Sequence, residues 1–515
     1  MKRIDPEPWE KLLTGSPVRQ GEAGFSKEIM RKIKERVEVR ERPRSRRWLM
    51  MGPVLAVCCA MLIVGLWKQE ELGGMLAQLS KPMEPVALKP MDRQTEMTLK
   101  VAYFHENTFM MNYGKAFTIR YPNMSVQVIP TETNGNQALD KEKLLELIDK
   151  ENPDVLYMSS ELYGELAKEG RLYPLDAVMK QDRYDLQSLY SGMTGTLREL
   201  GGGKLYGLAP TYEMEALYYN KELFDKFGIP YPNDKMSWEE VLLLAARFPA
   251  GGKPEERIYG LLANYYGSPS ALAARIGKTK GISLLSPDGK QATVNTEGWK
   301  NVWSMAIGGF QQGFVYQPQP RPQRSMMMEE MYKENPFITG KAAMALSSFS
   351  LAGDLKEAVS RYKMSSFPWD MVTEPVDPAR PNESSSFFMG GVYAVSAKSE
   401  HLRPAWEMIK LINSPEIMKK QSKSFGGGGL TVRLQEIKPD EEHHYAPFYT
   451  MKPAEQPDSA LHPRVLRKFN EAFTPLSAQK AKAVMEGSIK LDEGLKQLQE
   501  DAQRALFEAM LDSRN

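Results

Sequence analysis

Cysteine is almost absent from this chain of 515 residues, which contains only 2 cysteines. They are adjacent, at Cys58 and Cys59, inside a long uncharged segment. The residues that follow contain no cysteine, so their stability must come from a hydrophobic core rather than from disulfides. The length is too great for one core and predicts about two to three domains.

Motifs of several enzyme classes are also missing. The 5 histidines form no HExxH pair, and there is no GxSxG. The GGGK of residues 201–204 lacks the Ser or Thr of a phosphate loop, and the four glycines of residues 426–429 precede Leu-Thr-Val, unlike a dinucleotide-binding fingerprint. The acidic run before His443 and His444 favours solvated charge over a metal site. We therefore expect no enzyme, no cofactor and no metal.

A strong excess of one charge is absent as well. The net charge is +2, but residues 1–47 hold 14 basic and 8 acidic groups, which leaves 53 basic against 57 acidic in the rest of the chain. Binding to nucleic acid requires a basic face that displaces counterions from phosphates. A mildly acidic body therefore argues against a nucleic-acid partner.

One long segment contains no charge at all, from Trp48 to Trp67. Roughly 20 residues of helix measure about 30 Å, enough to cross a bilayer, and the terminal tryptophans suit its two interfaces. By the positive-inside rule the preceding arginines place the N-terminus in the cytoplasm and the body outside. The segment is thus expected to be a single-pass anchor in the cell membrane; the arginines are Arg40, Arg42, Arg44, Arg46 and Arg47.

The anchor is expected to remain uncleaved, because no A-x-A pattern follows it. The alternative is a lipoprotein processed at Cys58 or Cys59, but both lie in the middle of the apolar run. Residues 1–47 are then a basic cytoplasmic tail, and the proline-containing residues 68–96 are an extracellular linker.

Strands and helices alternate beyond the linker. Strands are expected near 98–104, 125–130 and 154–158, with helices ending near 121 and spanning about 140–150. Such alternation predicts an α/β body, 97–515, with a largely parallel sheet. Ile282 to Val294 predicts a hairpin, and the stripe near the C-terminus predicts a helix that packs on a lobe: Leu491, Leu495, Leu498, Ala502 and Ala505.

The most informative segment is YGLAPTYEMEALYYNK, Tyr206 to Lys221. It predicts a strand, a turn at Pro210, a second strand and then two helices. The second helix begins with a capping box of Ser237 and Glu240. Its apolar residues recur at helical spacing and predict one buried face: Trp238, Val241, Leu242, Ala245 and Ala246.

This segment and seven others, in the same order, resemble the extracellular solute-binding proteins of family 1, the carbohydrate-type receptors of ABC importers. The others include TLKVAYF (98–104), NPDVLYMSSELYGELAKEGRLYPLD (152–176), NPFITGKAAMALSS (335–348), FFMGGVYAVSAKSEHLRPAWEMIKLINSPEIM (387–418) and GGGGLTVR (426–433). Together they extend over roughly four-fifths of the chain.

The resemblance implies a two-lobed periplasmic-binding-protein-like fold with a hinge. We place the first lobe at about 97–210 and part of 341–390, and the second at about 211–340 and part of 391–515. The implied function is capture of a solute, expected to be an oligosaccharide, by a monomer that delivers it to ABC permease subunits. The alternatives are a sensor that signals to a kinase or through its tail and, more remotely, a carbohydrate-active enzyme.

Ligands of such folds bind at the carboxyl ends of strands, between lobes that close about a hinge. Glu213 falls where related sugar receptors carry a ligand-contacting Glu. After GKAAM the family often has a Trp that stacks on sugar, where this chain has Ser350 beside Phe349. The full candidate set is Phe104, His105, Asn107, Ser159, Ser160, Thr211, Tyr212, Glu213, Phe349, Ser350, Gly390, Gly391, Gly427 and Gly428.

Overall fold

The structure is a computed structural model that describes residues 87–132, 141–252, 257–263, 267–318, 324–422, 430–434, 442–454 and 461–512. None of the helices in these ranges is both long enough and apolar enough to span a bilayer. The expected anchor Trp48–Trp67, the basic tail, linker residues 68–86, Gly427 and Gly428 lie outside the described residues. Within the linker, residues 87–96 contain no helix or strand, and β1 begins at Met97.

The first lobe contains a five-stranded sheet in the order β2-β1-β3-β12-β4. β1 pairs in parallel with β2 and β3, whereas β12 runs antiparallel to β3 and β4. The parallel core agrees with the alternation in the sequence. The strand bounds are β1 Met97–Tyr103, β2 Met124–Pro130, β3 Val155–Met158, β4 Gly207–Leu208 and β12 Val392–Val395.

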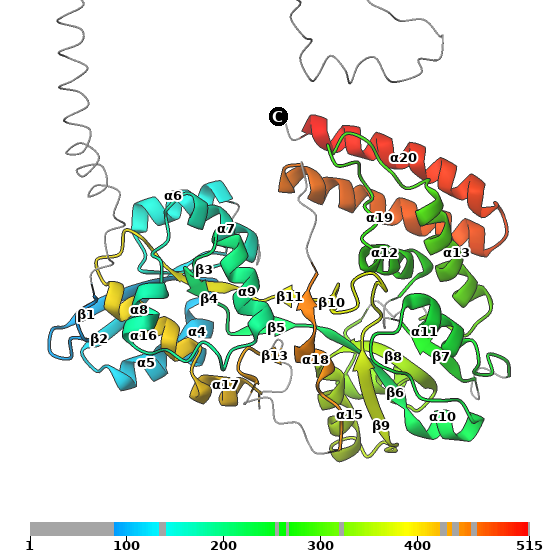
Figure 1. Cartoon of the computed structure of the whole chain (residues 1–515), viewed down its shortest axis with the longest axis horizontal. Helices are drawn as coiled ribbons and strands as arrows, with labels where there is room; N and C mark the ends of the chain where they lie inside the picture. The colour runs from blue at the N-terminus through cyan, green and yellow to red at the C-terminus, as the bar shows by residue number, and fades with distance from the viewer. Residues whose placement is uncertain are drawn as a thin grey trace, which may run out of the picture. The chain divides into compact units, whose positions relative to one another are not determined.

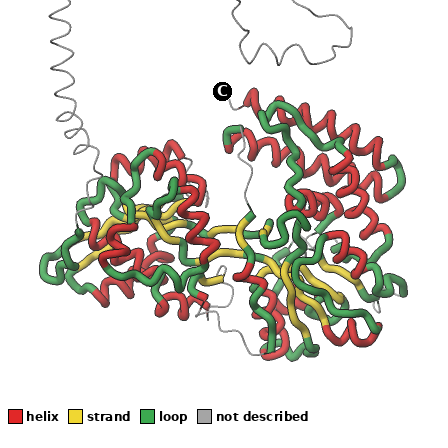
Figure 2. The backbone as a smooth tube through the Cα atoms, viewed as in Figure 1, coloured by secondary structure: helices red, strands yellow, loops and turns green. Residues whose placement is uncertain are grey.

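Helices cover this sheet (Figures 1 and 2). The expected helix before residue 121 is one helical segment interrupted by a π-helical turn. Trp406 is fully buried, and its Nε1–H donates to Asp182 Oδ2 at 3.0 Å. The helices are α4 Glu106–Phe109, η1 Met110–Gly114, α5 Lys115–Arg120, α6 Lys141–Glu151, α7 Ser160–Lys168, α8 Asp176–Gln181, α9 Ser191–Leu200, α16 Leu402–Ile412 and α17 Pro415–Ser422.

The second lobe is built on a four-stranded sheet in the order β7-β8-β6-β9. β6 is antiparallel to β8 and β9, whereas β7 and β8 are parallel. This pairing corrects the expected lobe boundaries. Residues 342–373 belong to the second lobe because β8 and β9 flank β6, and residues 392–395 return to the first. The bounds are β6 Glu215–Asn220, β7 Tyr259–Leu262, β8 Ala342–Ser348 and β9 Trp369–Thr373.

Helices also surround the second sheet. The predicted capping box is confirmed, since Glu240 N–H donates to Ser237 Oγ and Ser237 N–H donates to Glu240 Oε2. The predicted apolar face is buried except for Ala246, which is exposed because α11 ends at Ala245. These helices are α10 Lys221–Phe227, α11 Trp238–Ala245, α12 Pro269–Thr279, α13 Glu297–Gln311, α14 Met328–Glu334, α15 Ser350–Ser360 and α18 Pro447–Thr450.

Two long helices, α19 Pro463–Met485 and α20 Leu491–Asp512, form a hairpin that packs against α13. The predicted stripe on α20 is buried at four of its five positions, with Leu491 partly buried. The predicted hairpin at 282–294 is reduced to one antiparallel bridge, Leu285 to Ala292, around a turn with Gly289 at φ 70°.

Short strands join the lobes. β5 Thr211–Glu213 lies between β11 Phe388–Met389 and β13 Leu430–Thr431, antiparallel to both, and β10 Glu383–Ser384 pairs with β14 Lys452–Pro453. We call β11, β5 and β13 the crossing sheet. Since β5 leads directly into β6 and β11 leads into β12, it contains chain passing from each lobe to the other.

The contact between β7 and α11 leaves no space at Gly260. A Cβ there would meet the Ala245 carbonyl oxygen at 2.0 Å. We expect Gly260→Ala to lower the free energy of unfolding by about 3 kcal/mol, because backbone must move. Gly195→Ala, on the open surface of α9, is the control and should raise it by about 0.5–1 kcal/mol. Denaturant titration measures both, and equal effects would contradict the packing described.

Candidate functional site

Aromatic side chains gather at the carboxyl ends of β1 and β3. Phe104 follows β1 and lies 4.9 Å from the ring of Tyr157, edge to face, and Tyr157 lies 4.9 Å from Tyr103 and 4.7 Å from Tyr393. Phe104 and Tyr157 are only partly buried, whereas Tyr103 and Tyr393 belong to the core. The predicted residue Phe104 therefore presents part of a ring at this edge of the sheet.

The polar candidates beside Phe104 are exposed. His105 Nε2 lies 3.0 Å from Glu132 Oε2, which brings together the segments after β1 and β2. Asn107 lies on the exposed side of α4. Ser159 has a structural task, because its Oγ accepts from Leu162 N–H at the start of α7, and Ser160 is the first residue of that helix.

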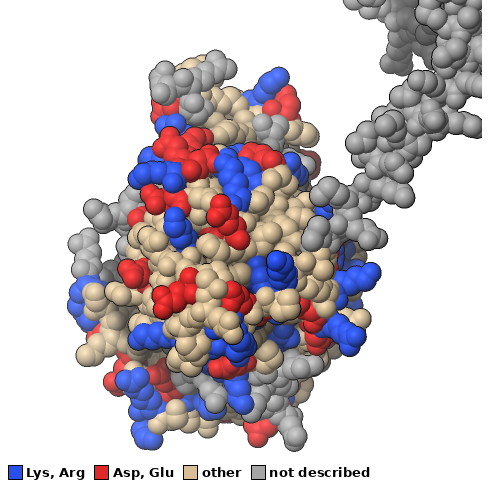
Figure 3. Space-filling model, turned by 90° about the vertical axis from the view of Figure 1, so that its left-hand side faces the viewer, with Lys and Arg blue, Asp and Glu red and all other residues tan. Residues whose placement is uncertain are grey.

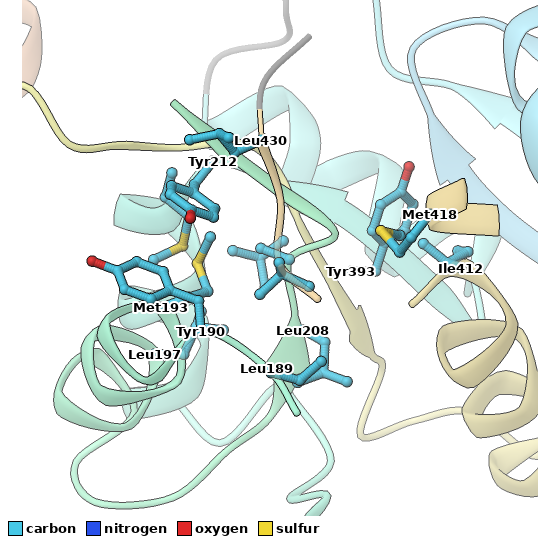
Figure 4. Packing of buried hydrophobic residues seen from close by; sticks show 14 of the residues in the cluster. Leu189, Tyr190, Met193, Leu197, Leu208, Tyr212, Tyr393, Ile412, Met418 and Leu430 are labelled. Atoms are coloured by element: carbon cyan, nitrogen blue, oxygen red, sulfur yellow. The ribbon is translucent and has the colours of Figure 1, made fainter. Parts of the chain in front are cut away.

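The three consecutive candidates of β5 divide between two faces. Tyr212 is 0% exposed, its hydroxyl donates to the Phe448 carbonyl at 2.9 Å, and its ring stacks on Tyr190 at 4.7 Å (Figure 4). Burial raises the pKa of Tyr212, so its hydroxyl stays protonated. The structure places Tyr212 in the core, whereas the sequence predicts a ligand contact for it. Successive side chains of a strand point to opposite faces, so only one face of β5 is buried here.

Glu213, on the other face, is exposed and forms no ion pair among the described residues. Thr211 shares this face and is partly buried. Directly across the ladder from Glu213 is Phe388, which sequence reasoning missed. Within the FFMGG segment, the sequence predicts only the two glycines as binding residues. It does not indicate that the ring of Phe388 points outward.

Gly390 and Gly391 permit close backbone approach. A Cβ on Gly391 would lie 1.9 Å from the Tyr157 ring, and one on Gly390 would lie 2.9 Å from the Thr211 carbonyl oxygen. The two glycines therefore connect the aromatic group of the first lobe with the crossing sheet. Thr211, Glu213, Gly390 and Gly391 therefore lie at or next to the crossing sheet.

Phe349 and Ser350 follow β8, whose last residue Ser348 pairs with Glu215 at the start of β6. The Phe349 ring is occupied by packing, 5.7 Å from Tyr445 and 5.5 Å from Phe448. Ser350 is exposed, with its Oγ 2.9 Å from that of Ser348. This places both candidates at the end of the second sheet that faces the crossing strands.

A second missed feature is the ion pair of Glu215 and Arg275. Arg275, on α12, also donates from Nη1 to the Ala263 carbonyl at 2.9 Å, just after β7. The sequence does not indicate which basic side chain pairs with Glu215. Arg275 is 60 residues away in the sequence and gave no local signal.

A buried polar network holds the crossing strands to the second lobe. Glu374, 3% exposed, accepts from Ser386 N–H at 3.2 Å and bonds the hydroxyls of Ser384 and Ser386. Ser386 Oγ in turn accepts from Glu215 N–H at 2.9 Å. The residues that precede β11 and follow β5 are thereby fixed to each other. Burial, aided by the charge of Glu215, raises the pKa of Glu374.

Other features of the described surface are its charge pattern and two depressions away from the candidate residues. No group of three or more His, Cys, Asp or Glu in the described ranges is arranged to hold a metal ion. Basic and acidic side chains alternate on the face shown in Figure 3, without a continuous basic area. Depressions of about 600 Å³ on α20, around Phe507, and about 500 Å³ between β2 and α6 contain none of the candidate residues.

Comparison with known proteins assigns the family. Residues 112–447, which are 336 of the 515, match the family model described as bacterial extracellular solute-binding protein. The chain belongs to this family. Because this family consists of solute-binding proteins, the chain is a non-enzymatic protein. This conclusion rests on the family and not on the absence of enzyme motifs.

Relatives and solved structures agree. A binding protein of Brucella abortus (strain 2308) is 24% identical over 396 residues, 74% of this chain and 84% of the relative. The sugar-binding protein MalE of Xanthomonas citri has a TM-score of 0.56 at 17% identity, covering 81% of this chain and 100% of its own. An extracellular solute-binding protein family 1 of Alicyclobacillus acidocaldarius has a TM-score of 0.56 at 18% identity, with coverage of 81% and 100%. The two-lobed fold expected from the sequence is confirmed.

The raised pKa of Glu374 predicts a pH dependence of stability. The folded state binds this proton more tightly than the unfolded chain, where the ordinary value is 4.5. Its stabilising effect is therefore complete below pH 4.5 and is lost as the pH rises through the raised pKa. Glu374→Gln should remove this dependence. Melting curves across that interval test it, and identical pH profiles for both proteins would contradict it.

Proposed function

We propose that this protein is a membrane-tethered extracellular receptor that binds an oligosaccharide and presents it to the permease subunits of an ABC importer. Family membership supplies the solute-binding role. The carrying observation is Glu213, an exposed carboxylate without an ion-pair partner among the described residues, at the crossing sheet. Such a carboxylate can accept hydrogen bonds from two sugar hydroxyls, and charge-assisted bonds are stronger than neutral ones.

Aromatic rings at the carboxyl ends of β1 and β3 support a sugar rather than an apolar solute. The partly exposed rings of Phe104 and Tyr157 can pack against the C–H faces of a pyranose. Two structures with the same fold are described as a sugar-binding protein, that of Xanthomonas citri, and a sugar transporter in an open conformation, from Rhizobium etli with a TM-score of 0.52.

Membrane tethering rests on the sequence of Trp48–Trp67 and the arginines before it. A receptor held at the membrane would remain close to its permease. By the positive-inside rule, the N-terminus of this receptor would lie in the cytoplasm and the body outside.

Glu213→Gln is expected to weaken sugar binding about tenfold to a hundredfold, because one oxygen becomes a donor and the charge is lost. The melting temperature should hardly change, since Glu213 is exposed. Glu222→Gln, on α10, is a matched exposed control. Calorimetric titration of full-length protein with the best sugar from a thermal-shift panel measures the affinity. A lower melting temperature with unchanged affinity would give Glu213 a structural role instead.

N-terminal sequencing of membrane-extracted protein tests the anchor. We expect to recover residues of the basic tail, because no cleavage pattern follows Trp67. A mature chain that starts at Cys58 or Cys59 and bears a lipid would show lipoprotein processing and refute the uncleaved anchor.

A further inference from the structure

Phe388 is an exposed aromatic residue on a strand that joins the lobes. Its side chain is 63% exposed. Exposed rings cost solvation free energy, and single ones are common on helix surfaces. Phe388 differs in that it lies on the crossing sheet, opposite Glu213 and two residues before Gly390.

The register of the pairing between β11 and β5 determines which residue lies opposite Phe388. Phe388 is directly opposite Glu213, and Met389 is opposite Tyr212. Directly opposed side chains project from the same face with Cβ atoms about 4.5–5.5 Å apart. Met389 and Tyr212 are buried, so the ring of Phe388 and the carboxylate of Glu213 share the exposed face.

Neighbouring contacts keep this face open. Phe387 points to the buried side, where its ring stacks on Tyr212 at 5.9 Å, and its N–H donates to Ser384 Oγ at 3.1 Å. The next residue on the face of Phe388 is Gly390, which has no side chain. A sugar ring that lies beside Phe388 therefore meets no side chain at position 390.

The other aromatic candidate is already occupied. Phe349 is packed between Tyr445 and Phe448. The ring and carboxylate of Phe388 and Glu213 are the pair of groups that a pyranose requires, one for its C–H face and the other for its hydroxyls. Binding of an apolar peptide or a lipid would not require the carboxylate of Glu213.

We propose that Phe388 is a stacking platform for one pyranose ring of the bound sugar, whose hydroxyls are held by Glu213. This assignment rests on the proposed function, and it moves the stacking contact from the region of Phe349 to the crossing sheet. A ring that loses most of its exposure on binding contributes about tenfold or more in affinity.

Full-length Phe388→Ala and Phe507→Ala form a matched pair, because Phe507 on α20 is 60% exposed. The probes are maltotriose, cellotriose and raffinose, of which the one that most raises the wild-type melting temperature is titrated. Phe388→Ala should lose about tenfold or more in affinity with the melting temperature of the free protein unchanged, and Phe507→Ala should lose none. Phe388→Trp should retain affinity and show a larger tryptophan fluorescence change on binding than wild type, which already contains 8 tryptophans.

The outcomes separate the two proposals. If a sugar binds wild type and Phe388→Ala equally well, the stacking platform is wrong while the sugar receptor stands. If Phe507→Ala alone weakens binding, the sugar lies on α20 instead. If none of the three sugars affects wild type, the sugar-binding function fails, and the platform fails with it.

Discussion

The structure depends on the narrow crossing sheet, and above all on the side chain of Tyr212. Its ring forms a cluster with those of Tyr190 and Phe387, and its hydroxyl donates a hydrogen bond to the Phe448 carbonyl. With Tyr212 inside, strand alternation directs Glu213 outward. One buried residue thereby determines which chemical groups the chain presents where it passes between its lobes.

The crossing strands are held at both ends by different forces. At the first lobe, Gly391 allows the backbone to approach the Tyr157 ring, which is possible only without a Cβ. At the second, the carboxyl group of Glu374 bonds to the serines before β11, and Ser386 bonds to the start of β6. Both arrangements restrict the ends of the strands while leaving the face of Glu213 uncovered.

Features set by neighbouring residues could be predicted from the sequence. The capping box of Ser237 and Glu240 and the strands of the first lobe are such features, and so is the family itself. Features set by distant pairing could not. The lobe boundaries were misplaced because β8 and β9 join β6 across more than a hundred residues. The sequence of β5 is only three residues long and does not indicate which face of the strand is buried. It therefore predicts a ligand contact for Tyr212. The partner of Glu215 was missed because Arg275 lies on a separate helix.

Small-angle scattering of the full-length protein, with and without a saturating sugar, tests the central claim most directly. In the proposed function, a ligand binds against the crossing sheet between lobes that close over it. Wild-type protein saturated with sugar should therefore have a smaller radius of gyration than the free protein. A sugar concentration that saturates wild type but lies below the dissociation constant of Glu213→Gln should leave the radius of that variant unchanged. An unchanged radius in wild-type protein that calorimetry shows to be saturated would contradict closure around the ligand.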